Sequence, residues 1–337
     1  MKKNFDAVDL AKLVASILIF AMHFSALSDF GNAYLFVEII CRWGVPFFFI
    51  ASAFFLFSKS ENGNISKQRL IDYVKRIFYL YLAWAIINVL NIVYLRIYTP
   101  GYTQLSTYLC FIRDIFISST FSGSWFLVGC MFAAWLIYVL SKKLKTSVIL
   151  ALTFVLYAIT AISSVYGNAV TGQISAVLDF LKFPWNIFTA CFYFALGKYA
   201  CERQEKLLSV FKRPLSIILA IVFFALFAGE VIVSFNLGFL RYTDVGFFVA
   251  PSAFMLFLVC LQSNIKLKNN IIMRKMSIII YVSFGNLLLV RGFLKRIVGL
   301  TANLPLYLIC FALSLLICFV VLQLQKKTNR RWVNYLT

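Results

Sequence analysis

The single histidine of the chain stands in an apolar stretch near the N-terminus, where its ring could take part in acid–base chemistry. His23 follows Lys12 by eleven residues. On an α-helix this spacing puts the two side chains on one face and roughly 16 Å apart along the axis. An imidazole suits general base work on a hydroxyl, because its pKa lies near the working pH. An interhelical hydrogen bond is the structural alternative for His23.

Lys12 is the second candidate on this face, and two kinds of partner would explain a cation there. Asp9 precedes Lys12 by three residues, which is close enough for an ion pair at the membrane surface. Alternatively, Lys12 binds an anionic part of a substrate. Because ionisable residues are costly in a bilayer, both Asp9 and Lys12 are candidate binding residues.

Later apolar stretches carry polar residues that predict a cavity at about the depth of His23. Arg42 follows Glu38 by four residues, so it either neutralises that carboxylate or stabilises charge that develops in a reaction. Glu230 lies at a similar depth in another stretch, and Trp125 opens a further one. Together these residues indicate a buried polar cavity that opens to one side. For Glu230, a packing or interfacial role is the alternative.

The composition shows what kind of element must position these residues. Of 337 residues, 62% are hydrophobic and 13% are charged, whereas a soluble domain carries roughly 25% charged residues. An ordinary soluble protein is therefore excluded. Apolar runs of about the length that crosses a bilayer predict an all-α, polytopic membrane protein with about ten transmembrane helices. The ten runs are 8–27, 36–57, 77–95, 122–141, 147–164, 185–201, 215–236, 246–262, 278–294 and 304–325.

The gaps between the runs and the charge of the chain complete this picture. No gap is long enough for a soluble domain, so we expect a single transmembrane domain over residues 1–337. The net charge is +20, with 32 Lys and Arg residues, and membrane proteins concentrate these residues in cytoplasmic loops. If the N-terminus is inside and successive loops alternate between the two sides of the membrane, most of the Lys and Arg residues fall in loops on the cytoplasmic side. This predicts both termini in the cytoplasm and the lipid bilayer as a partner, and it makes nucleic acid unnecessary.

Metal binding is not expected from the ligand types present. The chain has one histidine, and its eight cysteines lie mostly in apolar runs without a Cys-x-x-Cys pair. These residues predict neither a zinc site nor a disulfide framework.

Several motifs, in their order along the chain, resemble the acyltransferase type 3 family of bacterial multi-pass membrane O-acyltransferases. The family opens its first span with Asp-x-x-Arg followed by a His, and Asp9, Lys12 and His23 stand in those places. Its second span is similar to Arg-Trp-Gly-Val-Pro-Phe-Phe-Phe-Ile-Ala-Ser-Ala-Phe at 42–54, a block that also looks like the membrane half of vancomycin-resistance serine racemases. Further similarities are a basic run at 69–76, Trp-Phe-Leu at 125–127, Leu-Gly at 196–197 and a Ser-x-x-Ile-Tyr segment at 277–281.

The resemblance implies transfer of an acyl group, typically acetyl, from a cytoplasmic acyl-CoA to a hydroxyl of a cell-surface polysaccharide or its lipid-linked precursor. This would be O-acetylation at the bacterial cell (inner) membrane. Acyl-CoA would be a substrate, with no bound cofactor. His23 would be the general base, and Arg42 would orient substrates or stabilise charge. The substrate-binding residues, whose cations would meet the CoA phosphates, would be Asp9, Lys12, Arg69, Arg76, Trp125 and Glu230.

The chain departs from the family pattern at four places. Lys12 replaces an Arg, Ala53 replaces a usual Gly, Phe284 stands where many members carry a second His, and a common Pro is missing at 80–81. Arg and Lys differ in how they bind phosphate or carboxylate, so the first change bears on the donor. A non-enzymatic exporter of polysaccharide or lipid, or a small-molecule permease, is the alternative function. It would explain the spans and the polar cavity equally well, but not the spacing of the lone histidine from the lysine.

Overall fold

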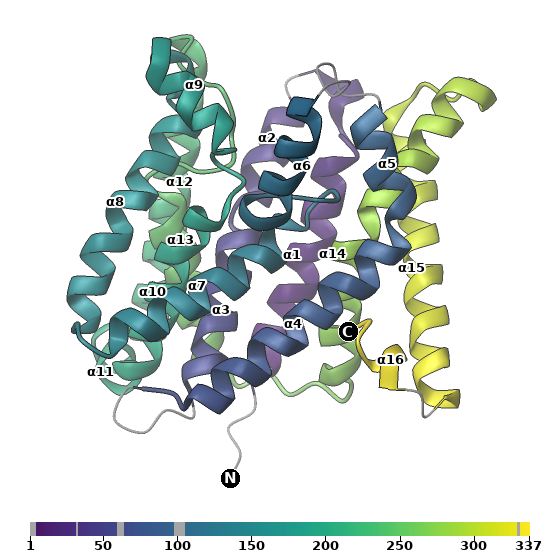
Figure 1. Ribbon diagram of the computed structural model, residues 1–337. Coiled ribbons are helices and arrows are strands. Elements are labelled where there is room, and N and C mark those ends of the chain that lie inside the picture. Colours follow the sequence, from purple (N-terminus) through teal and green to yellow (C-terminus); the bar gives the residue numbers. More distant parts are fainter. Residues whose placement is uncertain (1–4, 32, 59–63, 98–104, 329–330) are drawn as a thin grey trace.

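The computed structural model describes residues 5–31, 33–58, 64–97, 105–328 and 331–337. In this part of the chain the regular elements are helices, and no strand is among them. Most of the helices stand side by side in a bundle, labelled in Figure 1. A helix satisfies its own backbone hydrogen bonds where no water can do so, and this favours an all-helical structure in lipid.

Each of the ten predicted runs falls on a helix or a pair of helices. In chain order these are α1 (Asp6–His23), α2 (Ala33–Cys41) with α3 (Gly44–Phe57), α4 (Lys67–Ile87) with α5 (Val89–Ile97), α7 (Trp125–Ser141), α8 (Thr146–Ser164), α10 (Ile187–Glu202), α12 (Arg213–Asn236), α13 (Val249–Leu261), α14 (Asn270–Phe293) and α15 (Asn303–Lys327). Shorter helices between and after them are α6 (Leu105–Ile117), α9 (Gly172–Phe180), α11 (Gln204–Val210) and α16 (Arg331–Asn334).

The number of membrane spans is smaller when length and hydropathy decide. Among the described residues, 5 helical segments are long and apolar enough to cross a membrane, and the bent pair α4–α5 would make 6. α7 and α13 are apolar but shorter, and α1 carries Asp6, Asp9 and Lys12 within its 18 residues. The chain is therefore a helical membrane protein with several spans, while the count of ten stays a prediction.

The centre of the bundle is built on close helix crossings. α1 packs along α14, and α3 packs along α10. At the second crossing a Cβ on Gly197 would collide with the carbonyl oxygen of Ile50 and lie 2.6 Å from the Cβ of Ala53. Small residues let helices approach in this way in membranes. The absence of a side chain at Gly197 therefore lets α3 lie close to α10. Residues of α3 line the site described below.

Two of the predicted spans are interrupted inside the bundle. Arg42 lies at the break between α2 and α3. α4 and α5 meet at a bend of 72°, where Asn88 Nδ2 donates to the carbonyl oxygens of Trp84 at 2.9 Å and Val282 at 3.4 Å. Side chains that bond carbonyls in this way make a helix break tolerable in lipid. The breaks thus bring polar side chains into the interior of the bundle.

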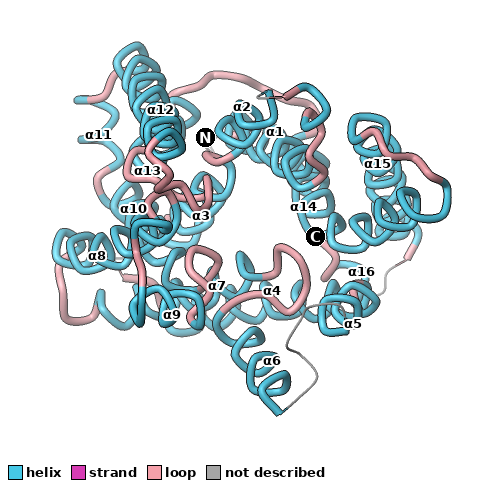
Figure 2. The backbone as a smooth tube through the Cα atoms, turned by 90° about the horizontal axis from the view of Figure 1, so that it is seen from above, coloured by secondary structure: helices cyan, strands magenta, loops and turns pink. Residues whose placement is uncertain are grey.

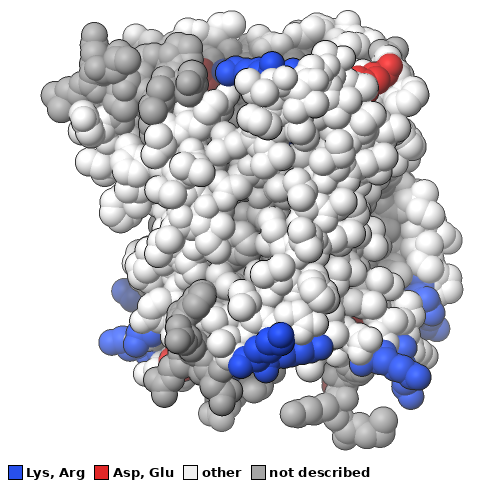
Figure 3. Space-filling model, turned by 90° about the vertical axis from the view of Figure 1, so that its right-hand side faces the viewer, with Lys and Arg blue, Asp and Glu red and all other residues white. Residues whose placement is uncertain are grey.

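The two ends of the bundle differ in charge. Figure 1 places the start of α1, the starts of α4 and α14, and α11 at one end, which we call the basic end. There Asp6 accepts hydrogen bonds from the amide of Leu267 (2.7 Å) and from Asn270 Nδ2 (2.6 Å). In Figure 3, Lys and Arg gather toward this end, next to a broad band without charged residues. The positive-inside rule assigns this end to the cytoplasm, and that orientation stays a prediction.

Viewed from above, the helices surround the middle of the molecule (Figure 2). α1, α3, α4, α7 and α14 lie closest to it in that view. These helices supply most of the lining of the first two cavities described next.

Candidate functional site

A cavity of about 810 Å³ at the basic end is lined by cations from three helices. Lys12 comes from α1, Arg69 and Arg76 come from α4, and Arg274 comes from α14. Asp72 is the only carboxylate among these described lining residues, and its Oδ1 accepts a hydrogen bond within α4 at 2.8 Å. We name this space the basic cavity. Its surplus of positive charge suits an anionic ligand.

The ion pair considered between Asp9 and Lys12 is replaced by a pair between two helices. Asp9 is 1% exposed, and its carboxylate accepts hydrogen bonds from Nε (3.0 Å) and Nη2 (2.7 Å) of Arg274. The guanidinium makes this two-point contact because it is planar, which a Lys ammonium cannot match. In the described part of the chain no carboxylate pairs with Lys12, whose Nζ lies 5.2 Å from the ring centroid of Phe55. Lys12 therefore lines the cavity, whereas Asp9 joins α1 to α14.

Arg69 and Arg76 both line the basic cavity but differ in their surroundings. Arg69 donates to the carbonyl oxygens of Leu56 (Nε, 2.7 Å) and Phe55 (Nη2, 2.9 Å). It thereby satisfies carbonyls at the C-terminal end of α3, which have no partner within the helix. Arg76 is exposed and stacks over the ring of Tyr73 at 5.8 Å. Arg76 is thus better placed than Arg69 to bind a ligand with its whole guanidinium.

A narrower pocket of about 300 Å³ continues from the basic cavity toward the middle of the bundle. The two spaces share Lys12, Ser52, Arg76 and Arg274. Ser52 Oγ and the hydroxyl of Tyr73 form a hydrogen bond of 2.7 Å where they meet. We name this space the apolar pocket, because its further lining is mostly apolar and aromatic, including Phe48, Phe126, Leu127, Cys130 and Tyr281.

A third space, of about 500 Å³, lies at the opposite end of α1. α1 contributes Lys12 to the basic cavity and His23 to this one. The two residues are roughly 16 Å apart along the helix axis. We name this space the histidine cavity, and its polar and aromatic lining comprises His23, Tyr34, Glu38, Arg42, Trp185, Phe235, Arg241, Tyr242, Thr243 and Asp244.

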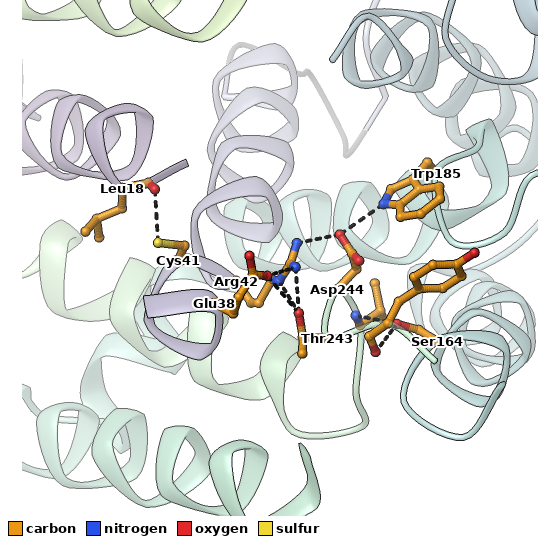
Figure 4. A network of polar contacts seen from close by, with 10 residues as sticks. Leu18, Glu38, Cys41, Arg42, Ser164, Trp185, Thr243 and Asp244 are labelled. Carbon is orange, nitrogen blue, oxygen red and sulfur yellow. Dashed lines mark hydrogen bonds and ion pairs between the residues drawn. The ribbon is translucent and has the colours of Figure 1, made fainter. Parts of the chain in front are cut away.

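Arg42 is the centre of a polar network on the wall of the histidine cavity (Figure 4). It pairs with Glu38, one of the two roles expected from the spacing, and its Nη1 also pairs with Asp244 Oδ1 at 2.5 Å. Its Nε and Nη2 donate to Thr243 Oγ1 at 3.0 and 2.6 Å. Asp244 Oδ1 accepts a further hydrogen bond from Trp185 Nε1 at 2.9 Å. Because both carboxylates hold it, the guanidinium keeps one orientation and shapes the cavity wall.

His23 ends α1 with its side chain exposed to the histidine cavity. Its ring stacks on Phe284, with ring centroids 4.2 Å apart and an angle of 11° between the planes. Within the described residues, neither ring nitrogen has a hydrogen-bond partner, so the interhelical bond considered for the imidazole is not seen there. The backbone carbonyl of His23 accepts instead from Arg291 Nη1 at 3.4 Å. An imidazole with open nitrogens in a cavity can accept a proton from a bound hydroxyl.

Trp125 lies beside the histidine cavity. It lines a small pocket of about 30 Å³ together with Arg42 and Asp244. Its ring centroid is 5.6 Å from that of Phe49, a buried residue of α3. The structure therefore brings Trp125 close to the Arg42 network, where it lines the small pocket without a polar contact to that network.

Glu230 is not brought to either cavity. Glu230 is buried, with 8% of the residue exposed. Its carboxylate accepts hydrogen bonds from the amides of Phe247 (2.8 Å) and Phe248 (3.3 Å) and from the hydroxyl of Tyr166 (3.1 Å). These amides lie directly before α13, where helix N–H groups need an acceptor. These contacts match the packing alternative, and the substrate-binding role expected for Glu230 stays a prediction.

Three residues of these cavities and their walls were not among the predicted site residues. Asp244 and Arg274 lie near the ends of apolar runs and count as loop charges in a hydropathy profile, and Phe284 was noted only as a departure from the family pattern. Their sequence signal is weak, because hydropathy does not tell which way a residue at a helix end faces. Among the described residues, no group of three His, Cys, Asp or Glu side chains could hold a metal ion.

Known proteins resemble the chain in two ways. A family model of the acyltransferase type 3 kind, described as an acyltransferase domain, matches residues 5–323. Two relatives from Enterococcus faecalis are both named amino-acid racemase: one is 27% identical over 61% of this chain and 30% of its own length, and the other 24% identical over 98% of this chain and 47% of its own length. The chain thus spans at most about half the length of these relatives. No solved structure matches it.

Proposed function

This chain belongs to the acyltransferase type 3 family, and on that premise we propose the substrates and the residues of its reaction. The donor is a cytoplasmic acyl-CoA, with acetyl as the acyl group. The acceptor is a hydroxyl of a cell-surface polysaccharide or of its lipid-linked precursor. The protein lies in the bacterial inner membrane with the basic end in the cytoplasm, so that donor and acceptor enter from opposite ends.

The basic cavity and the apolar pocket support the binding of acyl-CoA. Lys12 and Arg76 line both spaces and have no carboxylate partner among the described residues, so they can meet the phosphates of the donor. The apolar pocket leads from these cations toward Phe126 and Tyr281, and its aromatic lining suits the less polar thioester arm. This arrangement favours one orientation of the donor, with its phosphates in the basic cavity and its acyl group in the apolar pocket.

The reaction is a transfer of the acyl group from sulfur to oxygen. His23 accepts the proton of the acceptor hydroxyl through a ring nitrogen, and the hydroxyl oxygen forms a bond with the thioester carbonyl carbon. The carbon–sulfur bond then breaks, and the CoA sulfur leaves with the proton. Arg42 acts on the acceptor side as a positioning residue, because Glu38 and Asp244 already engage its guanidinium.

One observation carries this proposal. A single helix, α1, has its cation Lys12 in the basic cavity and its histidine in the other cavity. Donor recognition and proton acceptance are thereby held at a spacing of roughly 16 Å by helix geometry alone. A solute channel would need the polar lining but not this division of residue types between its two ends.

The proposal is tested by acyl transfer in membranes that contain the protein. Membrane vesicles open to the basic end receive acyl-labelled acetyl-CoA, and label is measured in the glycan and glycolipid fractions. His23→Gln keeps a polar side chain of similar length but cannot serve as the base, so labelling should fall about 10²-fold or more. The amount of protein in the membrane should stay the same. Equal labelling by wild type and His23→Gln would remove His23 from the reaction.

A second candidate is a permease, and the printed names of the two relatives suggest an amino acid as its solute. The chain matches part of proteins called amino-acid racemase, and the histidine cavity holds both carboxylates and a guanidinium that could bind a zwitterion. Uptake of labelled serine or alanine into proteoliposomes without acyl-CoA distinguishes the two. Uptake that His23→Gln leaves unchanged, together with no acyl transfer by wild type, would favour the permease.

A further inference from the structure

The ring of Phe284 lies between the apolar pocket and the histidine cavity. Its face stacks on His23, with centroids 4.2 Å apart, and its centroid is 6.0 Å from that of Tyr281 in an edge-on contact. Tyr281 lines the apolar pocket and His23 lines the histidine cavity. Phe284 itself is 1% exposed. On this line, therefore, one aromatic ring separates the two spaces.

A glycine on the facing segment leaves the space that the Phe284 ring occupies. Gly123 has a φ of +84°, and a Cβ at this position would lie 2.6 Å from the Phe284 ring. The carbonyl oxygen of Gly123 accepts a hydrogen bond from the hydroxyl of Tyr281 at 3.1 Å. A positive φ and the lack of a side chain are both properties that glycine supplies. The segment before α7 thus leaves a slot that the Phe284 ring fills.

Stacking on Phe284 is also the contact that orients the imidazole. Neither ring nitrogen of His23 has a hydrogen-bond partner in the described part of the chain, whereas most functional histidines are oriented by such a bond. The plane of His23 is set instead by the parallel ring of Phe284. A change at residue 284 should therefore alter both the orientation of the base and the separation of the two spaces.

We propose that Phe284 positions His23 and separates the apolar pocket from the histidine cavity, so that the acceptor hydroxyl outcompetes water for the acyl group. This inference rests on the proposed acyl transfer. In the competing reaction a water oxygen bonds the thioester carbonyl carbon, the carbon–sulfur bond breaks, and the products are a free carboxylic acid and CoA thiol. An aromatic side chain between the thioester and the wet cavity excludes this water until the acceptor is seated.

The first test compares transfer with hydrolysis. Phe284→Ala leaves a void beside polar groups that water can enter. In nanodiscs, the ratio of free CoA released to acceptor acylated should rise severalfold. The kcat for transfer should fall by roughly tenfold to a hundredfold, because the base is misplaced, while the KM for acyl-CoA stays within about twofold, since the cations of the basic cavity are untouched. Phe284→Tyr, which keeps the ring, should restore the wild-type ratio.

A matched control removes a ring of the same size elsewhere. Phe311 on α15 stacks on Tyr307, with centroids 5.7 Å apart, and it is not among the residues that line the described cavities. Phe311→Ala should lower stability without changing the ratio of hydrolysis to transfer. A rise of the ratio in both variants, or in neither, would overturn the role given to Phe284.

A second measurement does not depend on activity. Cys130 lines the apolar pocket and is 1% exposed. An impermeant thiol reagent applied from the side of the histidine cavity should leave Cys130 unmodified in wild type and modify it in Phe284→Ala, with the labelled peptide identified by mass spectrometry. Phe284→Leu, a milder change, should give partial labelling if the alanine variant does not fold. Absence of labelling in folded variants would overturn the separation.

The two proposals fail in different ways. If wild type neither acylates an acceptor nor releases CoA, the proposed function fails, whatever the labelling shows. If wild type acylates its acceptor but Phe284→Ala changes neither the ratio nor the labelling of Cys130, only the inference about Phe284 fails.

Discussion

At the junction of the basic cavity and the apolar pocket, Lys12 is one of two cations, with Arg76, that have no carboxylate partner in the described part of the chain. Because its charge is available to the donor, we expect Lys12→Met to raise the KM for acyl-CoA about tenfold, which corresponds to about 1.4 kcal/mol. The kcat should change little. Steady-state kinetics with acetyl-CoA measure this.

The control for this prediction is Lys142, which follows the last residue of α7 and, like Lys12, lies over an aromatic ring. Lys142 Nζ is 4.6 Å from the ring centroid of Tyr138, but Lys142 does not line the described cavities. Lys142→Met should leave the KM at its wild-type value. An equal rise in both variants would mean that general surface charge, not the cavity, attracts the donor.

Arg274 supports α1 through Asp9, and this gives a prediction about stability. In Arg274→Gln the Asp9 carboxylate, 2% exposed at its side chain, loses its two-point partner. We expect a loss of about 1.5–3 kcal/mol in the free energy of unfolding. A lower melting temperature in detergent, without donor, would show it, and the double change with Asp9→Asn should recover part of the loss.

The same measurement tests which cation pairs with Asp9, Arg274 as in the structure or Lys12 as the sequence suggested. If Asp9 pairs with Arg274, Lys12→Met should melt close to wild type. Melting of Lys12→Met well below that of Arg274→Gln would restore the pair with Lys12 that the structure replaces.

At the scale of elements, the crossing of α3 and α10 is the most sensitive contact that a small change can test. In Gly197→Ala the new methyl group meets the backbone of Ile50 and the side chain of Ala53, so the helices must separate. We expect a loss of about 1–3 kcal/mol in the free energy of unfolding, measured as a lower melting temperature in detergent.

Gly229 on α12 is the matched control, because a Cβ there meets nothing within 4 Å. Gly229→Ala should be neutral or slightly stabilising, since alanine costs less backbone entropy than glycine in a helix. If both alanine variants behaved alike, helix propensity rather than the crossing would decide the stability of this region.

The breaks in the helices matter for the site as much as the crossings do. Arg42 lies where α2 gives way to α3, which turns its guanidinium toward Asp244, a residue 202 positions later in the chain. A continuous helix would keep the pair with Glu38, four residues earlier, as its local partner. The additional partner exists because the loop before α13 approaches the break.

At the scale of the whole molecule, the basic cavity and the histidine cavity lie toward opposite ends of α1, and the surface between the two ends of the bundle carries a broad uncharged band (Figure 3). We predict that the basic end faces the cytoplasm. An impermeant maleimide added to intact cells should modify Phe30→Cys, which replaces a residue 59% exposed at the opposite end. It should modify Lys67→Cys, an exposed site at the basic end, only after permeabilisation.

The natural cysteines are separated from the introduced ones by mapping the labelled peptides. Labelling of Lys67→Cys in intact cells, with Phe30→Cys protected, would invert the orientation. The donor would then have to enter from outside the cell, where acyl-CoA is not supplied, and the proposed function would fail with it.

Local properties of the sequence determined the helices and the placement of residues on one helix. The apolar runs predicted where α8, α12 and α15 lie to within a few residues, because the hydropathy of a segment depends on that segment alone. The division of Lys12 and His23 between two ends of one face followed from helix geometry. The pair of Glu38 and Arg42 followed in the same way from their separation of four residues.

Contacts between helices were decided only by the tertiary structure. Asp9 meets Arg274, Arg42 meets Asp244, and His23 meets Phe284, each across more than 200 positions of the chain. Such pairs depend on the rotation and the register of one helix against another, which are set by packing. An apolar segment that satisfies its own backbone bonds can lie in lipid at any rotation, so its sequence alone does not say which neighbour its few polar residues will face.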